Sequence, residues 1–285
     1  MRFILLHHHI FKNAGASLDM ALKRHFGQKF TEFHPSGVDN GRIYKRQLLS
    51  LLESRPDIEA ISSHHFLGRD FRSLLSQEEM ERFVFHDFSL IRHPINRLIS
   101  TYLYYRTIGS GQHPVQIIAN KYSAKGFIEA LLDKHPNFVI NPQVTIFGCD
   151  QYGSAPSSKN LDIATNRIAR MSVIGTVERY HDAMTVGEYM MQPIYPSLTL
   201  HGRRENRSDQ SKIGGYDGSL PAIRGIIGDA LYDTLLRVSE LDIQLWVNAS
   251  NELDYRIRHV PNFETRLKDF YHRCDMPTAK MTSTQ

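Results

Sequence analysis

The run HHHIFKNAGASL at residues 7–18 constrains the fold more than any other stretch of this 285-residue chain. The segment from Arg2 to Ile10 is rich in Phe, Ile and Leu and predicts a buried strand. The segment from Ser17 to Phe26 has apolar residues at 18, 21, 22 and 26, which is the spacing of an amphipathic helix. A helix start presents unpaired N–H groups and the positive end of the helix dipole. The run therefore predicts an anion site between a strand and a helix.

The rest of the chain continues to alternate strands with helices. Ser76 and Glu79 have the spacing of a capping box at the start of one helix. Further strands are expected at 58–63, 83–92 and 172–178, and helices at 42–54, from 76, from 94, in pieces over 114–147, and at 227–246. This order predicts an α/β fold with a P-loop-like parallel sheet flanked by helices. We expect one domain over residues 1–285, with a frayed tail from about residue 275.

Composition excludes few functions. Lys and Arg total 34 against 30 Asp and Glu, so the net charge of +4 suits a phosphate-bearing molecule, an acidic acceptor or nucleic acid. The two cysteines, Cys149 and Cys274, are far apart and form neither a disulfide framework nor a paired metal motif. The opening MRFILLHHHIF is too short and too polar for a membrane span and lacks a cleavage site. We therefore expect a protein without a transmembrane segment.

The first loop differs from the loop that holds nucleotide triphosphates, G-x-x-x-x-G-K-[ST]. Gly15 and Ser17 match its last glycine and its hydroxyl, but Ala16 occupies the lysine position. The lysine is instead Lys12, three residues before the glycine. From these residues alone, an anion loop and an ordinary strand–turn–helix with a surface lysine are equally open.

A second signal is LIRHPINRLISTYLYYR at residues 90–106. Arg92 ends a predicted strand, Pro94 is suited to the first position of a helix, and Ser100 follows on that helix. Ligands of open α/β sheets bind at the carboxyl ends of strands, and the fork of a guanidinium group suits phosphate. Alone, Arg92 could equally be a surface charge. Two such sites on adjacent strands imply a ligand with two separated charged groups.

These two runs resemble motifs of sulfotransferases, in particular the carbohydrate or heparan sulfate 2-O-sulfotransferase-like group. HHHIFKNAGASL is similar to the loop that binds the 5′-phosphosulfate, and LIRHPINRLISTYLYYR to the 3′-phosphate motif. Weaker similarities occur in SSHHFLG (62–68), NPQVTIFG (141–148), VIGTVERYHDAM (173–184) and ENRSD (205–209). Together they cover roughly residues 1–210 in the family's order.

The resemblance implies a sulfuryl donor, 3′-phosphoadenosine 5′-phosphosulfate (PAPS), and a hydroxyl acceptor on a glycan, glycolipid or small metabolite, with carbohydrate or glycolipid the first expectation. It implies no need for a metal ion and no nucleic acid. Lys12 and His64 or His65 would be catalytic, the histidine serving as base, and one sequence does not choose between the two histidines. The expected cofactor-binding residues are Lys12, Asn13, Ala14, Gly15, Ala16, Ser17, Arg92, Ser100, Asn206 and Arg207.

The histidine triplet at residues 7–9 suggests a metal site, but the pattern does not favour one. On a strand His7 and His9 share a face and His8 points the other way, so at most two could bind one ion. With no Cys, Asp or Glu expected nearby to complete a site, we interpret the triplet as polar residues at the ligand-facing end of the strand.

Three alternatives remain open. The chain could be a P-loop nucleotide or small-molecule kinase, a sulfotransferase-like protein that binds nucleotide without catalysis, or a nucleic-acid-binding module using the basic loop at 201–207. Acceptor specificity would come from residues 28–40, 107–125 and 192–220, which resemble the family least. Eukaryotic relatives of the family are anchored in the Golgi, so a sequence without an anchor predicts either a bacterial, cytoplasmic protein or a chain from which the anchor has been removed.

Overall fold

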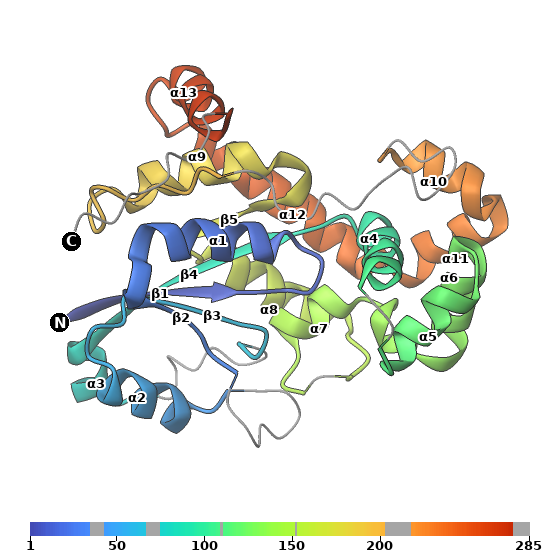
Figure 1. Cartoon of the computed structure of the whole chain (residues 1–285), viewed down its shortest axis with the longest axis horizontal. Helices are drawn as coiled ribbons and strands as arrows, with labels where there is room; N and C mark the ends of the chain where they lie inside the picture. Colours follow the sequence, from blue (N-terminus) through green and yellow to red (C-terminus); the bar gives the residue numbers. More distant parts are fainter. Residues whose placement is uncertain (35–42, 67–74, 109–110, 152, 203–217, 276–285) are drawn as a thin grey trace.

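The computed structural model describes residues 1–34, 43–66, 75–108, 111–151, 153–202 and 218–275. Its centre is a five-stranded, all-parallel sheet with the order β2-β3-β1-β4-β5, flanked by helices (Figure 1). The strands are β1 (Arg2–His8), β2 (Phe30–Glu32), β3 (Ala60–Ser63), β4 (Phe83–Ile91) and β5 (Val173–Thr176). The predicted α/β class and parallel sheet are confirmed.

The helices fill the connections between strands and most of the chain after β5. Those up to β5 are α1 (Gly15–Phe26), α2 (Lys45–Ser54), α3 (Gln77–Arg82), α4 (Pro94–Thr107), α5 (Pro114–Lys121), α6 (Ala124–Lys134), α7 (Pro142–Gly148) and α8 (Ser158–Ala169). Those after it are α9 (Tyr180–Met191), α10 (Leu220–Ile227), α11 (Asp229–Val238), α12 (Glu240–Ile257) and α13 (Phe263–Asp275).

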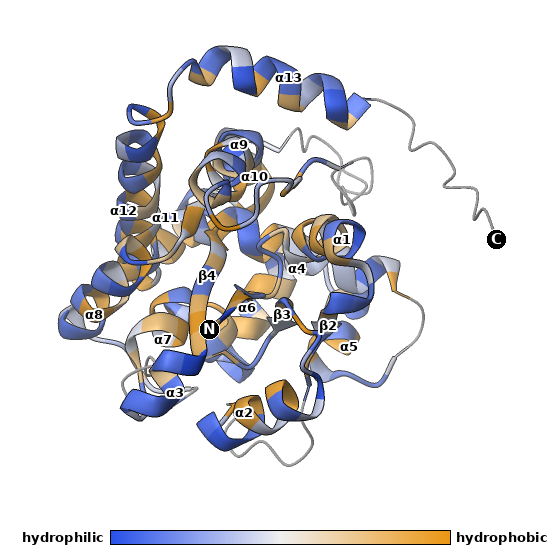
Figure 2. Ribbon diagram, turned by 90° about the vertical axis from the view of Figure 1, so that its left-hand side faces the viewer, coloured by the Kyte–Doolittle hydropathy of each residue, from blue (hydrophilic) through white to orange (hydrophobic). Residues whose placement is uncertain are grey.

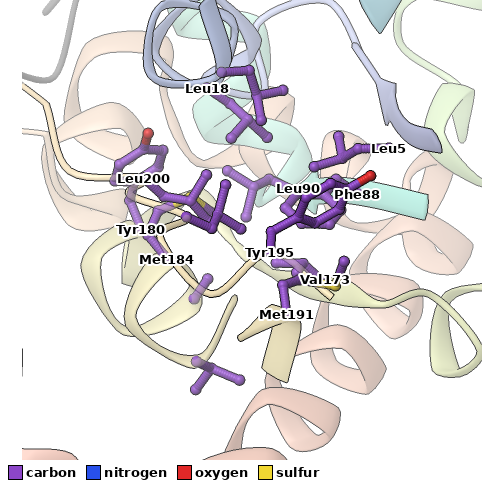
Figure 3. Close-up of a cluster of buried hydrophobic side chains, with 14 of the residues drawn as sticks. Leu5, Leu18, Phe88, Leu90, Val173, Tyr180, Met184, Met191, Tyr195 and Leu200 are labelled. Atoms are coloured by element: carbon purple, nitrogen blue, oxygen red, sulfur yellow. The ribbon is translucent and has the colours of Figure 1, made fainter. Parts of the chain in front are cut away.

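Alternation along the strands sends apolar side chains to both faces of the sheet. Leu5 on β1 packs with Leu18 and Leu22 of α1 on one face, in a core that α9 and α12 complete (Figure 3). Its neighbours Ile4 and Leu6 pack on the other face in a separate cluster, with the apolar side of α2. Burial on both faces explains why β1 has a nearly continuous apolar sequence.

A further hydrophobic cluster is formed by helices, with no strand residue among its described members. It joins α4, α5, α6, α10 and α11 through side chains such as Leu98, Phe127 and Leu235. Figure 1 shows these helices gathered beyond the end toward which β1 points. Because all five strands are parallel, the loops after β1, β3 and β4 open toward this helical cluster. The carboxyl edge of the sheet is thus enclosed by helices on one side.

Several expected elements have different bounds. The helix predicted over 227–246 is two helices, α11 and α12, which break at the fully buried Ser239. The edge strand β2 at Phe30–Glu32 and the helices α8, α9, α10 and α13 were not anticipated. The capping box at Ser76 and Glu79 is confirmed by bonds of 2.6 and 3.2 Å. The tail predicted from about residue 275 falls almost wholly outside the described residues, which end at 275.

In the described part of the chain, no helix is long and apolar enough to cross a bilayer. Even α12, the 18-residue helix, mixes hydrophilic and hydrophobic residues along its length (Figure 2).

The packing of α7 on α8 makes a testable prediction. A Cβ on Gly148 would lie 2.0 Å from the backbone oxygen of Asn160 on α8, so the two helices would have to move apart. We expect Gly148→Ala to destabilise the protein by about 1–3 kcal/mol. The matched control is Gly225→Ala on α10, where a Cβ would meet nothing within 4 Å. That variant should be more stable than wild type by about 0.5–1 kcal/mol, because alanine favours helix. Urea unfolding of both variants checks this, and equal stabilities would contradict it.

Candidate functional site

The loop between β1 and α1 has an unusual backbone. Lys12 and Ala14 have φ values of 66° and 59°, in the left-handed region that non-glycine residues rarely adopt. A Cβ on the next residue, Gly15, would lie 2.1 Å from the His9 ring, so any larger residue there would force that ring to move. Ala14 is the N-cap of α1 and cannot cap it with a side chain, and the first turn carries no acidic residue. These features leave the helix start suited to an external anion.

Gln143 on α7 connects this loop to the end of β4. Its Oε1 accepts from Asn13 Nδ2 at 2.7 Å and from the backbone N–H of Arg92 at 2.9 Å. Its Nε2 donates to the backbone oxygen of Arg92 at 2.8 Å. Asn13 Nδ2 also donates to the backbone oxygen of Leu90 at 2.8 Å. Asn13, one of the expected cofactor-binding residues, therefore fixes the loop to β4 through its side chain.

A buried acid on α12 positions Gln143 in turn. Asp242 is fully buried and accepts from the backbone N–H groups of Gln143 at 3.1 Å and Val144 at 2.8 Å. Its own N–H donates to Asn141 Oδ1 at 3.0 Å. Burial raises the pKa of Asp242, and these donors oppose that rise. The sequence predicted neither the role of Gln143 nor that of Asp242. The two residues lie 99 positions apart, and nothing in the sequence near either one indicates that they are in contact.

The structure brings the two predicted cations together. Arg92 Nη1 donates to the backbone oxygen of Lys12 at 2.9 Å. Lys12 Nζ lies over the ring of Tyr104, 4.3 Å from its centroid. Burial and the nearby charge of Arg92 lower the pKa of Lys12 to about 8. No carboxylate of the described residues forms an ion pair with Lys12. The site is therefore positively charged and partly withdrawn from water.

For the other predicted cofactor-binding residues, the structure gives the burial of three, and two are not described. Ser17 is buried in the first turn of α1, with Ala16 half-buried beside it. Ser100 is buried on α4, eight residues after Arg92. Asn206 and Arg207 lie outside the described residues.

The histidine triplet contradicts one expectation. Asp19, one turn into α1, lies between the two histidines that share a strand face, 2.6 Å from His7 Nδ1 and 2.7 Å from His9 Nδ1. The acid comes from α1, which packs back across β1, and not from neighbouring sequence. Although burial opposes ionisation, the two histidines hold the pKa of Asp19 well below its usual range. Burial lowers the pKa of His7 despite this contact. The expectation that no acid stands near the triplet was wrong.

The two candidate bases, His64 and His65, follow the end of β3. His64 Nδ1 is 2.6 Å from the backbone oxygen of His9, and a carbonyl only accepts, so Nδ1 carries the proton and Nε2 the lone pair. The His64 ring lies 4.0 Å from that of His9. Partial burial of the ring and then the neighbouring His9 lower the pKa of His64 to about 4, although the side chain keeps contact with solvent. Both histidines face one cavity, because the chain leaves the strand at Ser63 and the strict alternation of a strand ends there.

That cavity has a volume of about 330 Å³ and lies between the ends of β1 and β3 and helices α4 and α7. The described residues that line it are His8, His9, Ile10, Phe11, Ser63, His64, His65, Phe66, Tyr105, Phe138 and Ile146. The loop that carries Lys12 begins at its wall, since Phe11 is a lining residue. A molecule in the cavity would thus lie next to the positively charged loop.

Comparison with known proteins gives little functional information. No protein-family model matches the chain. An uncharacterized protein of the archaeon Archaeoglobus fulgidus is 27% identical over 248 residues, which is 86% of this chain and 95% of the relative. The similarity therefore extends over most of both proteins and is not confined to the loop.

The buried position of Lys12 predicts an unusual titration. Because its pKa is lowered from 10.5 to about 8, Lys12 should lose its proton in mildly alkaline solution. Reductive ¹³C-methylation followed by NMR titration checks this, and the Lys12→Met variant identifies the signal. A midpoint near 10.5 would show that the amine is fully hydrated and would contradict its burial beside Arg92.

Proposed function

We propose that this chain is a sulfotransferase that moves the sulfuryl group of PAPS to an acceptor hydroxyl. The observation that carries the proposal is the pairing of Lys12 and Arg92 at the ends of the neighbouring strands β1 and β4. Two cations brought this close repel each other, and an anion between them would relieve the repulsion. The uncapped start of α1 adds backbone donors at the same place.

In this proposal the donor has two holding points. Lys12 and the N–H groups of Ala14, Gly15 and Ala16 bind the 5′-phosphosulfate, since those of Asn13 and Ser17 already donate to the backbone oxygens of Ile10 and Ala14. Lys12 also stabilises the charge that develops on the bridging oxygen. Arg92 and Ser100 bind the 3′-phosphate, with Asn206 and Arg207 as further candidates. A sulfuryl group carries less charge than a phosphoryl group, which lessens the need for a metal ion. The Ala16 that replaces the P-loop lysine then causes no loss of function, and we place the kinase alternative second.

The acceptor would occupy the cavity beside the loop. Its hydroxyl oxygen attacks sulfur in line with the bond to the leaving oxygen; the new S–O bond forms as the bond to the phosphate oxygen breaks. The hydroxyl proton passes to His64 Nε2, which holds a lone pair because Nδ1 donates to His9. The products are the sulfate ester and adenosine 3′,5′-bisphosphate. We favour His64 over His65 because this hydrogen bond fixes its tautomer.

Nucleotide binding tests the donor site. We expect adenosine 3′,5′-bisphosphate to bind without magnesium, as measured by calorimetry. Lys12→Met should weaken that binding on the order of tenfold or more, because it removes a charge-assisted hydrogen bond, and should lower kcat for transfer by about 10²–10³-fold. The control is Lys125→Met, an exposed lysine on α6. Magnesium-dependent binding of ATP in place of the bisphosphate would instead support the kinase alternative.

The pH profile tests the base. His64 must be neutral to accept a proton, and its pKa is lowered to about 4, so kcat/KM should stay level as the pH falls through 6.5 and decline only near pH 4–5. On the alkaline side, kcat/KM should fall above about pH 8 as free Lys12 loses its charge. His64→Asn should lower kcat by about 10²-fold or more. An acid limb near 6.5, with activity kept in His64→Asn, would exclude His64 as the base.

A further inference from the structure

The cavity beside the loop is lined mainly by apolar side chains. Two isoleucines and four aromatic residues form most of its wall: Ile10, Ile146, Phe11, Phe66, Phe138 and Tyr105. The described lining residues include no lysine, arginine, aspartate, glutamate or side-chain amide. A charged or many-hydroxylated molecule would therefore find few polar partners in the described part of this wall.

Several of the polar lining groups already bond within the protein. His8 contacts Asp87 at 2.9 Å through Nε2 and the backbone oxygen of Phe66 at 3.1 Å through Nδ1, so both ring nitrogens are engaged. The hydroxyl of Ser63 donates to the backbone oxygen of Phe33 at 2.6 Å. His9 uses Nδ1 for Asp19. The polar side chains left to contact a ligand in the described wall are thus mainly the histidines next to the loop, His64 and His65.

A buried hydroxyl that lacks a partner is costly, so this wall discriminates between acceptors. A sugar ring carries a hydroxyl on most of its carbons, and only one of them can be next to His64. A flat ring with one hydroxyl could place that hydroxyl at His64 and its carbon face against the aromatic wall. Aromatic contacts of this kind contribute beyond the area they bury.

We propose that the acceptor is a small phenol, bound with its ring in this cavity and its hydroxyl at His64. The inference rests on the proposed function and replaces the carbohydrate expected from the family resemblance.

The weak basicity of His64 supports the same acceptor. A phenolic hydroxyl has a pKa near 10, as in tyrosine, whereas water has one of about 15.7 and is a guide to aliphatic alcohols. With a pKa of about 4, His64 is poorly suited to an aliphatic hydroxyl and better suited to the more acidic phenol.

The test uses 2-naphthol, whose fluorescence reports its binding to the full chain saturated with adenosine 3′,5′-bisphosphate. Turnover with PAPS is measured by mass spectrometry for 2-naphthol, cyclohexanol and methyl glucoside. We expect 2-naphthol to bind and to be sulfated with a kcat/KM at least about tenfold above the other two. Ile146→Asn should weaken naphthol binding about tenfold, and Ile163→Asn, an exposed isoleucine on α8, should not change it. Neither variant should alter binding of the bisphosphate.

The outcomes separate this inference from the proposed function. Normal bisphosphate binding with no naphthol binding, or with binding unaffected by Ile146→Asn, overturns the phenol site and leaves the transferase standing. Naphthol that binds but is not sulfated, or methyl glucoside that is the better acceptor, also overturns it. Failure of the bisphosphate to bind would overturn both.

Discussion

The carboxamide of Gln143 is the contact that holds together the segments after β1 and β4, where the candidate site lies. Its oxygen takes two donors, from Asn13 and Arg92, and its nitrogen meets two acceptors, the Arg92 carbonyl and Asp242. Only one orientation of the amide satisfies all four contacts, since the reverse would set like groups against each other. Asp242 therefore determines, through Gln143, how the loops after β1 and β4 sit relative to each other. A glutamate here would turn an oxygen toward Asp242 and lose that arrangement.

These hydrogen bonds also fix where the two positive charges at this edge lie. Arg92 is held with its guanidinium on the carbonyl of Lys12, and the Lys12 amine is directed over Tyr104. A cation on an aromatic face is attracted to it, but that attraction is small beside the loss of hydration that lowers the pKa of Lys12 to about 8. The fold thus maintains a positive site at a cost in stability. The left-handed backbone at Lys12 and Ala14 is a second destabilising feature of the same loop. Destabilising features of this kind are typical of ligand-binding sites.

The sequence was informative where the signal is local. The strands expected at 2–10 and 83–92 end at His8 and Ile91, close to where the sequence placed them, and Pro94 marked the start of α4. Long-range contacts were beyond its reach: Asp242 lay inside a predicted helix with nothing to indicate that it faces α7. The helix break at Ser239 was missed because an apolar periodicity continues across it, while the buried Ser239 hydroxyl bonds to Val139 from a distant segment. Asp19 was missed for a related reason, since helix packing, not sequence proximity, brings it to His7 and His9.

Asp19 also determines what kind of base this edge can offer. Its two oxygens contact His7 and His9, so the negative charge acts mainly on these two strand histidines and only weakly on His64. His64 instead contacts the His9 carbonyl and ring. A nearby carboxylate raises the pKa of a histidine and burial lowers it; burial outweighs Asp19 at His7, and partial burial together with the neighbouring His9 outweighs it at His64. The arrangement therefore gives His64 a fixed tautomer and low basicity. The chemistry at this cavity must then obtain its driving force from the leaving group beside Lys12 and from the acidity of the acceptor, and not from a strong base.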